Sequence, residues 1–281
     1  MPAVKLKFNK FRQNNLILLG LMLLMPTMFI GCDEFIDSDY RFEETFSKTI
    51  SLQEAGSFSL ENINGGVTIR TSPDRQVVIQ ATKYAKREKS DLDRIRIEVV
   101  QGERSVKVDT IYERKNLRAK VDYDLTVPEG MSLELIRTIN GKIVISGKYD
   151  RAELKTTNGS IEAKGDFNWL EASTTNGGLE ISGVRGKINL RTTNGSIKAE
   201  LDELSADFSA RTTNGSIRLA LGQEANARFI ARTTNGSIKV EYPVTVEGTV
   251  SRRRLGGSLG KGGEIRVSLE TTNGSISWVK L

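Results

Sequence analysis

Apolar and polar residues alternate with a period of two through most of the chain after residue 45, and this pattern predicts β-strands rather than helices. The alternation is clearest around the hexapeptide Thr-Thr-Asn-Gly-Ser-Ile, which stands at 156–161, 192–197, 212–217, 233–238 and 271–276. Ile188 and Leu190 illustrate the apolar pair before each hexapeptide, and Ile197 and Ala199 the pair after it. In this phase the first Thr faces a core. The second Thr and the residue before the first one face outward.

The hexapeptide recurs at a nearly constant interval. Looser copies stand at 138–143 and 174–179, and an outlying Asn-Gly-Gly begins at Asn64. The asparagines at 140, 158, 176, 194, 214 and 235 are separated by 18, 18, 18, 20 and 21 residues, while the steps from 64 to 140 and from 235 to 273 are 76 and 38. All these steps fit multiples of about 19, a period typical of a solenoid or a related repeat array.

Two topologies use such a pattern, because Asn-Gly between strands is also a strong hairpin signal. In a meander of hairpins, successive turns lie about 9.6 Å apart and nothing requires them to be identical. In a coil that adds one rung per repeat, the turns stack about 4.8 Å apart, so that amide ladders and stacked threonines select the same residue at every level. The near-identity of the repeats favours the coil.

We therefore predict an all-β fold, a single-domain parallel β-solenoid with about 19 residues per rung over 46–281. Irregular rungs occupy 46–130 and regular Asn-Gly repeats occupy 131–281. The spacing predicts four rung intervals between Asn64 and Asn140. It also predicts one further rung between Asn235 and Asn273, with a corner at 256–259 that lacks the hexapeptide. Glycine is expected to supply a left-handed or otherwise strained corner. The predicted corner ladder consists of Asn64, Asn140, Asn158, Asn176, Asn194, Asn214, Asn235 and Asn273.

The N-terminus has the pattern of a secretory signal, with four basic residues before an apolar run from Leu16 to Ile30. An uncleaved membrane anchor is the weaker alternative, since this run is shorter than the roughly 20 residues of a spanning helix. The only cysteine of the chain, Cys32, follows directly. Its surroundings resemble the lipobox of bacterial lipoproteins, although Phe29 replaces the usual Leu. We predict a signal peptide at 1–31, lipidation of Cys32 and an acidic tether at 32–45.

The net charge of the chain without its signal peptide does not indicate a class of binding partner. Taking the four N-terminal cations from 41 basic residues leaves 37 against 35 acidic ones, a net charge of about +2. The basicity of the full chain is mostly a targeting feature, and we expect no nucleic-acid partner. The expected partner is the membrane, through acylated Cys32.

The early Asn64-Gly65-Gly66-Val67, the strand end Leu125-Thr126-Val127-Pro128 and the Thr-Thr-Asn-Gly-Ser-Ile series together resemble the bacterial putative-adhesin family of β-strand-repeat domains of unknown function, related to the head-GIN adhesin-like domains. The resemblance covers about 46–281. It implies an extracytoplasmic parallel β-solenoid with a role in adhesion or envelope function, and it transfers no catalytic residues.

Catalytic chemistry is poorly supported. The chain has no histidine, and acidic residues such as Glu153 and Glu171 are scattered over outward positions instead of being paired beside a groove. The segment 256–263 resembles a phosphate loop but has the wrong spacing and no following Ser or Thr. We therefore expect no enzyme, no metal site and no cofactor.

One outward position is a candidate binding site. Lys155, Arg191, Arg211 and Arg232 each precede the Thr-Thr pair, and stacking predicts a column of the three arginines at about 5 Å spacing. An envelope polyanion would relieve their repulsion. The alternative is that these cations only keep the sheet soluble.

The leading hypothesis is a non-enzymatic, lipid-anchored envelope protein that presents a repetitive surface for adhesion, for assembly with another envelope protein, or for binding an envelope polyanion or glycan. The alternatives are a periplasmic accessory sensor or regulator of envelope stress and, more remotely, a glycan-active β-helix enzyme. The expected location is extracytoplasmic, on the outer membrane or cell surface rather than the inner membrane.

Overall fold

The computed structural model describes residues 40–114, 117–222, 225–247 and 251–281, and Ser38–Leu281 forms a compact unit. The predicted signal peptide and Cys32 lie outside the described residues.

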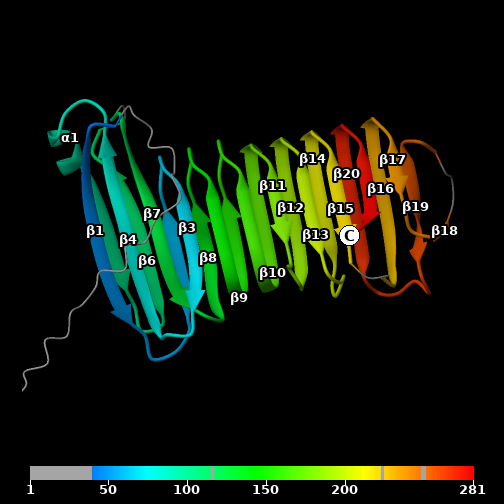
Figure 1. The fold of residues 1–281 in the computed structure, drawn as a ribbon, viewed down its shortest axis with the longest axis horizontal. Coiled ribbons are helices and arrows are strands. Elements are labelled where there is room, and N and C mark those ends of the chain that lie inside the picture. The colour runs from blue at the N-terminus through cyan, green and yellow to red at the C-terminus, as the bar shows by residue number, and fades with distance from the viewer. Residues whose placement is uncertain (1–39, 115–116, 223–224, 248–250) are drawn as a thin grey trace, which may run out of the picture. The chain divides into compact units, whose positions relative to one another are not determined.

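The elements in chain order are β1 (Phe42–Ser51), β2 (Ser57–Glu61), β3 (Val67–Ser72), β4 (Gln76–Ala85), α1 (Ser90–Asp93), β5 (Ile95–Gln101), β6 (Ser105–Tyr112), β7 (Ala119–Pro128), β8 (Met131–Arg137), β9 (Ile143–Lys155), β10 (Ile161–Asn176), β11 (Leu179–Ser182), β12 (Lys187–Asn194), β13 (Ile197–Leu201), β14 (Phe208–Asn214), β15 (Ile217–Leu221), β16 (Ala227–Asn235), β17 (Ile238–Val240), β18 (Val244–Val246), β19 (Arg254–Leu259), β20 (Arg266–Asn273) and β21 (Ile276–Lys280) (Figure 1).

The strands pair in two rows, and each Asn-Gly corner leads from one row into the other. We call the row that precedes the corners the proximal row. Its central part runs β2, β8, β9, β10, β12, β14, β20 and β16 in parallel. The distal row runs β7, β3, β9, β10, β11, β13, β15, β21 and β17, also in parallel. The predicted parallel β-solenoid is confirmed.

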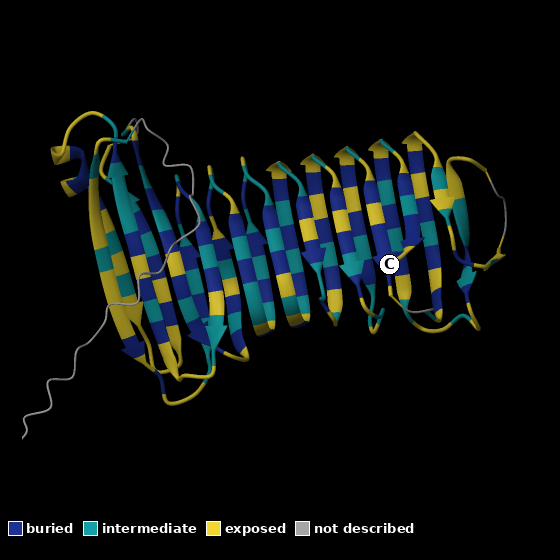
Figure 2. Cartoon of the chain, viewed as in Figure 1, coloured by how far each residue is buried: buried dark blue, intermediate teal, exposed yellow. Residues whose placement is uncertain are grey.

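The core lies between the rows and follows the predicted phase. The pair before each corner, such as Ile188 and Leu190, is buried, and the pair after it, such as Ile197 and Ala199, is buried at every corner except that of Asn235. Figure 2 shows the resulting alternation of buried and exposed positions along each strand. Ile238 and Val240 of β17 are only partly buried, since β17 is the last strand of its row. Burial of one face of every strand supplies the main driving force for stacking the rungs.

The asparagine side chains form one continuous amide ladder along the corners. From Asn140 onward, each Nδ2 donates to the Oδ1 of the neighbouring asparagine at 2.7–2.8 Å. The order of the ladder is Asn64, Asn140, Asn158, Asn176, Asn194, Asn214, Asn273 and Asn235. Each interior asparagine side chain thus donates to one neighbour and accepts from the other, which explains why one residue type recurs.

A second ladder runs just inside the first. The inward threonine of each rung is buried, as predicted, and its Oγ1 donates to the carbonyl oxygen of the corner glycine one rung away at 2.8–3.1 Å. The pairs are Thr138 to Gly65, Thr156 to Gly141, Thr174 to Gly159, Thr192 to Gly177, Thr212 to Gly195, Thr271 to Gly215 and Thr233 to Gly274. Buried hydroxyls are tolerated here because each has this partner.

The corner glycines act differently from the expectation. Among them only Gly65 has a positive φ, of 118°, so a left-handed backbone does not explain the others. A Cβ on Gly159, Gly177 or Gly195 would instead lie 1.9 Å from the carbonyl oxygen of the glycine one rung below. The corners stack so closely that a side chain has no room, and this selects glycine.

The C-terminal end corrects the predicted rung order. No rung built on 256–259 stands between Asn235 and Asn273; the two are direct neighbours, and Asn273 also pairs with Asn214. The last repeat in the sequence therefore lies between the two repeats that precede it. In Figure 1 the red β20 lies between the yellow β14 and the orange β16. The segment 254–259 is the antiparallel strand β19, which covers β16 and pairs with β18.

The N-terminal end is a cap that interrupts the coil. Asn64 is the direct neighbour of Asn140, so the 75 residues between them do not make four rung intervals. They build β4, which pairs antiparallel with β1 and β7, and the antiparallel pair β5 and β6. Strand β1 begins at Phe42, so the tether ends earlier than the expected residue 45. An antiparallel cap leaves no parallel rung edge open at this end.

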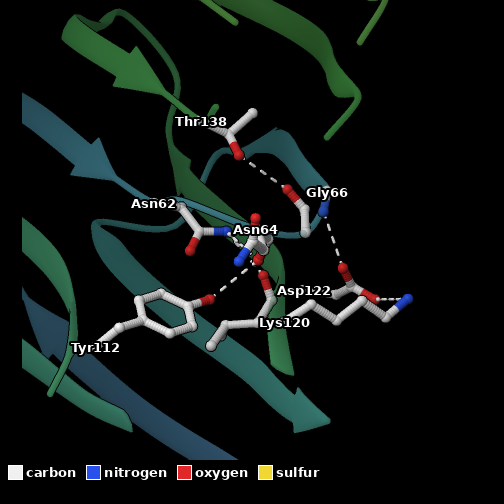
Figure 3. A network of polar contacts seen from close by, with 9 residues as sticks. Asn62, Asn64, Gly66, Tyr112, Lys120, Asp122 and Thr138 are labelled. Carbon is white, nitrogen blue, oxygen red and sulfur yellow. Dashed lines mark hydrogen bonds and ion pairs between the residues drawn. The ribbon is translucent and has the colours of Figure 1, made fainter. Parts of the chain in front are cut away.

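A polar network closes the ladder under this cap (Figure 3). Asn64 Nδ2 donates to the carbonyl of Ala119 at 3.3 Å, and Tyr112 donates to the Asn64 carbonyl at 3.2 Å. Asp122 accepts from the Gly66 amide at 2.8 Å and forms an ion pair with Lys120 at 3.0 Å. Burial raises the pKa of Tyr112 well above its usual value despite the hydrogen bond to Asn64. The phenol is therefore held as a donor.

Candidate functional site

The outward position before each Thr-Thr pair forms a row across the proximal strands. Neighbouring strands place Arg137, Lys155, Ser173, Arg191, Arg211, Glu270, Arg232 and Arg254 side by side in this row. The predicted column of Arg191, Arg211 and Arg232 is therefore interrupted. Arg191 and Arg211 are neighbours, but Glu270 separates Arg211 from Arg232 because the last repeat is inserted there. Ser173 likewise separates Lys155 from Arg191.

Glu270 binds the arginines on both sides. Arg211 donates from Nε to Glu270 Oε2 at 2.7 Å, and Arg232 Nη1 lies 3.8 Å from Oε1. The carboxylate offsets the repulsion between the two guanidinium groups and fixes their orientation. Lys155 is paired separately with Glu153 on its own strand. The four predicted cations thus fall into different environments.

Two further arginines reach the same area from the end of the solenoid. Arg253 and Arg254 lie at the turn that leads into β19, where the Arg254 amide donates to Ser251 Oγ at 3.0 Å. The Arg253 carbonyl accepts from the Thr233 amide at 2.9 Å, which fixes the turn beside the last corner. The repeat pattern does not predict either residue, since neither Arg253 nor Arg254 stands next to a hexapeptide. The run of three arginines at 252–254 was the signal that could have identified them.

These side chains line a surface groove of about 650 Å³, which we call the arginine groove. Its charged residues are four arginines and one glutamate. The polar lining is completed by the outward threonines Thr213, Thr234 and Thr272, which are exposed as predicted. The lining residues are Arg211, Thr212, Thr213, Arg232, Thr233, Thr234, Arg253, Arg254, Glu270, Thr271 and Thr272. Lys155 and Arg191 are not among them.

The groove is suited to an anion with several oxygens. Guanidinium groups donate in a planar fork that matches carboxylate, sulfate or phosphate groups. The threonine hydroxyls add neutral donors and acceptors of the kind that bind sugar hydroxyls. Arg211 and Arg232 stand on strands whose corners are held by the two ladders, so their backbone is fixed before a ligand binds, which lowers the entropic cost of binding.

The acidic residues of the site bear on metal binding and on glycan hydrolysis. Within the described ranges, no group of three or more His, Cys, Asp or Glu side chains is placed to hold a metal ion. Glu270 is the one carboxylate in the groove lining, whereas glycoside hydrolysis ordinarily needs two.

Comparison with known proteins identifies the family. The model of the Toastrack DUF4097 family matches residues 49–278. The chain belongs to the Toastrack family. This confirms the resemblance to an adhesin-like repeat family of unknown function, and no catalytic family is indicated. No curated protein matches the chain.

Three solved structures similar to the Toastrack unit have titles that read "putative" cell adhesion protein, adhesin or lipid binding protein. One is a "putative cell adhesion protein" from Clostridium sporogenes, with 11% identity, a TM-score of 0.39 and coverage of 85% of this chain and 100% of that one. A "putative adhesin" from Bacteroides fragilis has 11% identity, a TM-score of 0.39 and coverage of 85% and 97%. A "putative lipid binding protein" from Parabacteroides distasonis has 12% identity, a TM-score of 0.32 and coverage of 84% and 96%.

Two predicted features of the Toastrack chain remain predictions. Cys32, the proposed lipidation site, lies outside the described residues, as does the signal peptide. Across the described residues, no helix has the length and apolar character needed to span a bilayer.

Proposed function

We propose that the chain is a non-enzymatic, lipid-anchored protein of the cell envelope that binds an acidic polymer in the arginine groove. The ligand class is an anionic glycan or a phosphate-bearing envelope polymer. Acylated Cys32 would hold the protein on a membrane, with the β unit on the extracytoplasmic side. Adhesion or envelope assembly would follow from binding polymer attached to another surface.

The observation that carries this proposal is the unequal charge of the groove. Four arginines share one carboxylate, and Arg253 and Arg254 have no ion pair among the described residues. Positive charge that is not neutralised within the protein raises the local concentration of polyanions and speeds their association. The identical outward threonines on three neighbouring strands repeat at the strand spacing of about 4.8 Å, which suits a repeating ligand.

Binding is tested by retention on immobilised acidic polymers, with lipopolysaccharide, teichoic acid and an acidic polysaccharide as separate probes. We expect Arg211→Gln combined with Arg253→Gln and Arg254→Gln to abolish salt-sensitive retention. The matched control replaces three cations on the N-terminal cap by glutamine. If both variants lose retention equally, the effect of the groove substitutions comes from net charge alone. If the groove variant keeps its retention, the groove is not the binding site.

Anchoring and location are tested separately. Acyl labelling should mark the wild type and not Cys32→Ala. Protease added to intact cells should cleave the β unit if it lies on the cell surface. A labelled protein that resists external protease would reject cell-to-surface adhesion and favour the periplasmic sensor or regulator.

A further inference from the structure

A second basic surface lies at the opposite end of the solenoid, at the N-terminal cap. Two neighbouring hollows of about 430 and 560 Å³ share Leu117 and Arg118 in their linings. Together they are lined by six basic side chains, Lys86, Arg87, Arg94, Arg114, Arg118 and Lys120, and by three acidic ones, Glu88, Asp91 and Asp122. We call this surface the basic pole.

Part of this charge is neutralised and part is not. Arg94 pairs with Asp91 at 3.0 Å, and Lys120 pairs with Asp122 at 3.0 Å. Among the described residues, no ion pair involves Arg87, Arg114 or Arg118, and all three are exposed. Exposed like charges gathered in this way repel each other, so a fixed anionic partner would lower the free energy of the surface.

The chain enters the β unit at this same pole. The amide N–H of Arg41 donates a hydrogen bond to the carbonyl of Ala85 at 3.1 Å. Ala85 directly precedes Lys86 in the chain. The ring of Tyr40 lies 4.6 Å from Lys86 Nζ and 5.0 Å from Lys120 Nζ. Although burial opposes the charged form of Lys120, Asp122, Tyr40 and Tyr84 leave its pKa raised, so this cation stays charged beside the entry point.

The distance to the proposed anchor is short. Cys32 stands eight residues before Tyr40, so even a fully extended segment spans no more than about 28 Å. An acylated Cys32 would therefore keep the basic pole within a few Debye lengths of the bilayer surface, whereas the arginine groove lies near the far end of the stacked rungs.

We propose that the basic pole docks on the anionic phospholipid headgroups of the membrane that carries the anchor. The inference rests on the proposed lipid anchor. Arg87, Arg114 and Arg118 contact headgroup phosphates, while the Tyr40 contacts with Lys86 and Lys120 keep the first described residue of the β unit at this pole. Docking holds the solenoid with its arginine groove directed away from the bilayer.

The test uses the chain from Asp33 to Leu281, which keeps the compact unit and omits Cys32. Its binding to phosphatidylcholine vesicles with and without phosphatidylglycerol is measured by sedimentation, so that no acyl chain contributes. We expect binding that depends on phosphatidylglycerol and falls as salt rises. Replacing Arg87, Arg114 and Arg118 by Gln should lower vesicle affinity roughly ten- to a hundredfold.

The groove variant Arg211→Gln, Arg253→Gln and Arg254→Gln is the matched control, because it changes charge equally. It should keep vesicle binding, and the pole variant should keep retention on acidic polymer. Equal loss of vesicle binding in both variants, or binding without phosphatidylglycerol, would overturn the proposal. If vesicle binding appears only after Asp33, Glu34 and Asp37 are changed to amides, the acidic tether and not the membrane is the partner of the basic pole. That result would also overturn the proposal. Acyl labelling of Cys32 tests the anchor independently.

Discussion

Asn235 donates a hydrogen bond from Nδ2 to Oδ1 of Asn273, 38 residues further along the chain, at 2.8 Å. Asn273 in turn donates to Asn214 at 2.7 Å. The C-terminal repeat is therefore an interior rung that joins the body of the solenoid to its terminal strands. The same insertion places Glu270 between Arg211 and Arg232 and so shapes the arginine groove.

The inserted rung should be the point at which the C-terminal end is most easily destabilised. Trp278 is fully buried and makes edge contacts with Phe229 and Tyr242, at ring distances of 5.6 and 6.2 Å. We expect Trp278→Ala to lower the free energy of unfolding by about 3–5 kcal/mol, because a large cavity remains between adjacent rungs. Denaturant unfolding followed by circular dichroism measures the loss, and hydrogen exchange should show it concentrated in β16–β21. Trp169→Ala, a half-buried control beside Arg151, should cost clearly less, and equal costs would contradict the prediction.

Adjacent glycines at one corner should respond differently to the same change. A Cβ on Gly177 would lie 1.9 Å from the Gly159 carbonyl oxygen, so Gly177→Ala should destabilise by about 3 kcal/mol or more. The nearest heavy atom to a Cβ on Gly178 is the Ser196 oxygen at 3.3 Å, so Gly178→Ala should cost less than about 1 kcal/mol. Thermal unfolding of both variants compares them directly. Similar melting temperatures would show that close stacking does not select the corner glycine.

Stability should fall at alkaline pH. Burial raises the pKa of Tyr123 to about 12, although its hydrogen bond with Thr110 acts in the opposite direction. A phenol whose folded pKa exceeds its unfolded value of 10.0 stabilises the fold fully below pH 10, and this contribution is lost as pH rises from 10 towards 12. Denaturant midpoints across this window should decline. In Tyr123→Phe, the slope of the free energy of unfolding against pH in this window should fall by the equivalent of about one proton. An unchanged slope would show that Tyr123 is not the group that titrates.

Removing the carboxylate from the arginine groove should strengthen binding of acidic polymers. Glu270 competes with a ligand anion for Arg211 and Arg232. We expect Glu270→Gln to raise affinity about three- to tenfold and to shift elution from an acidic polymer to higher salt. Glu171→Gln, which removes an outward carboxylate outside the groove lining, should have little effect. Weaker binding in Glu270→Gln would contradict the prediction, because it would mean that the orienting effect of the carboxylate on the arginines outweighs its competition with the ligand.

The candidate site could be predicted only in part. Arg211 and Arg232 were identifiable because their position repeats with the hexapeptide, and the alternation of polar and apolar residues places that position on the outer face. Glu270 holds the same position in the last repeat, but only the rung order makes it their neighbour. Arg253 and Arg254 belong to no repeat and reach the groove through an antiparallel strand.

The sequence by itself determined the rung, namely its length, its buried face, its inward threonine and its Asn-Gly corner, because each depends on contacts within one repeat and on identical neighbours above and below. Only the tertiary structure decided which rung lies next to which. Nearly identical repeats present nearly identical edges, so their local free energies do not distinguish the orders Asn214, Asn235, Asn273 and Asn214, Asn273, Asn235. The choice depends on how β19 pairs with β16 and β18 pairs with β19 at the open end, and on the burial of Trp278 between rungs. These long-range contacts have no counterpart in the local pattern.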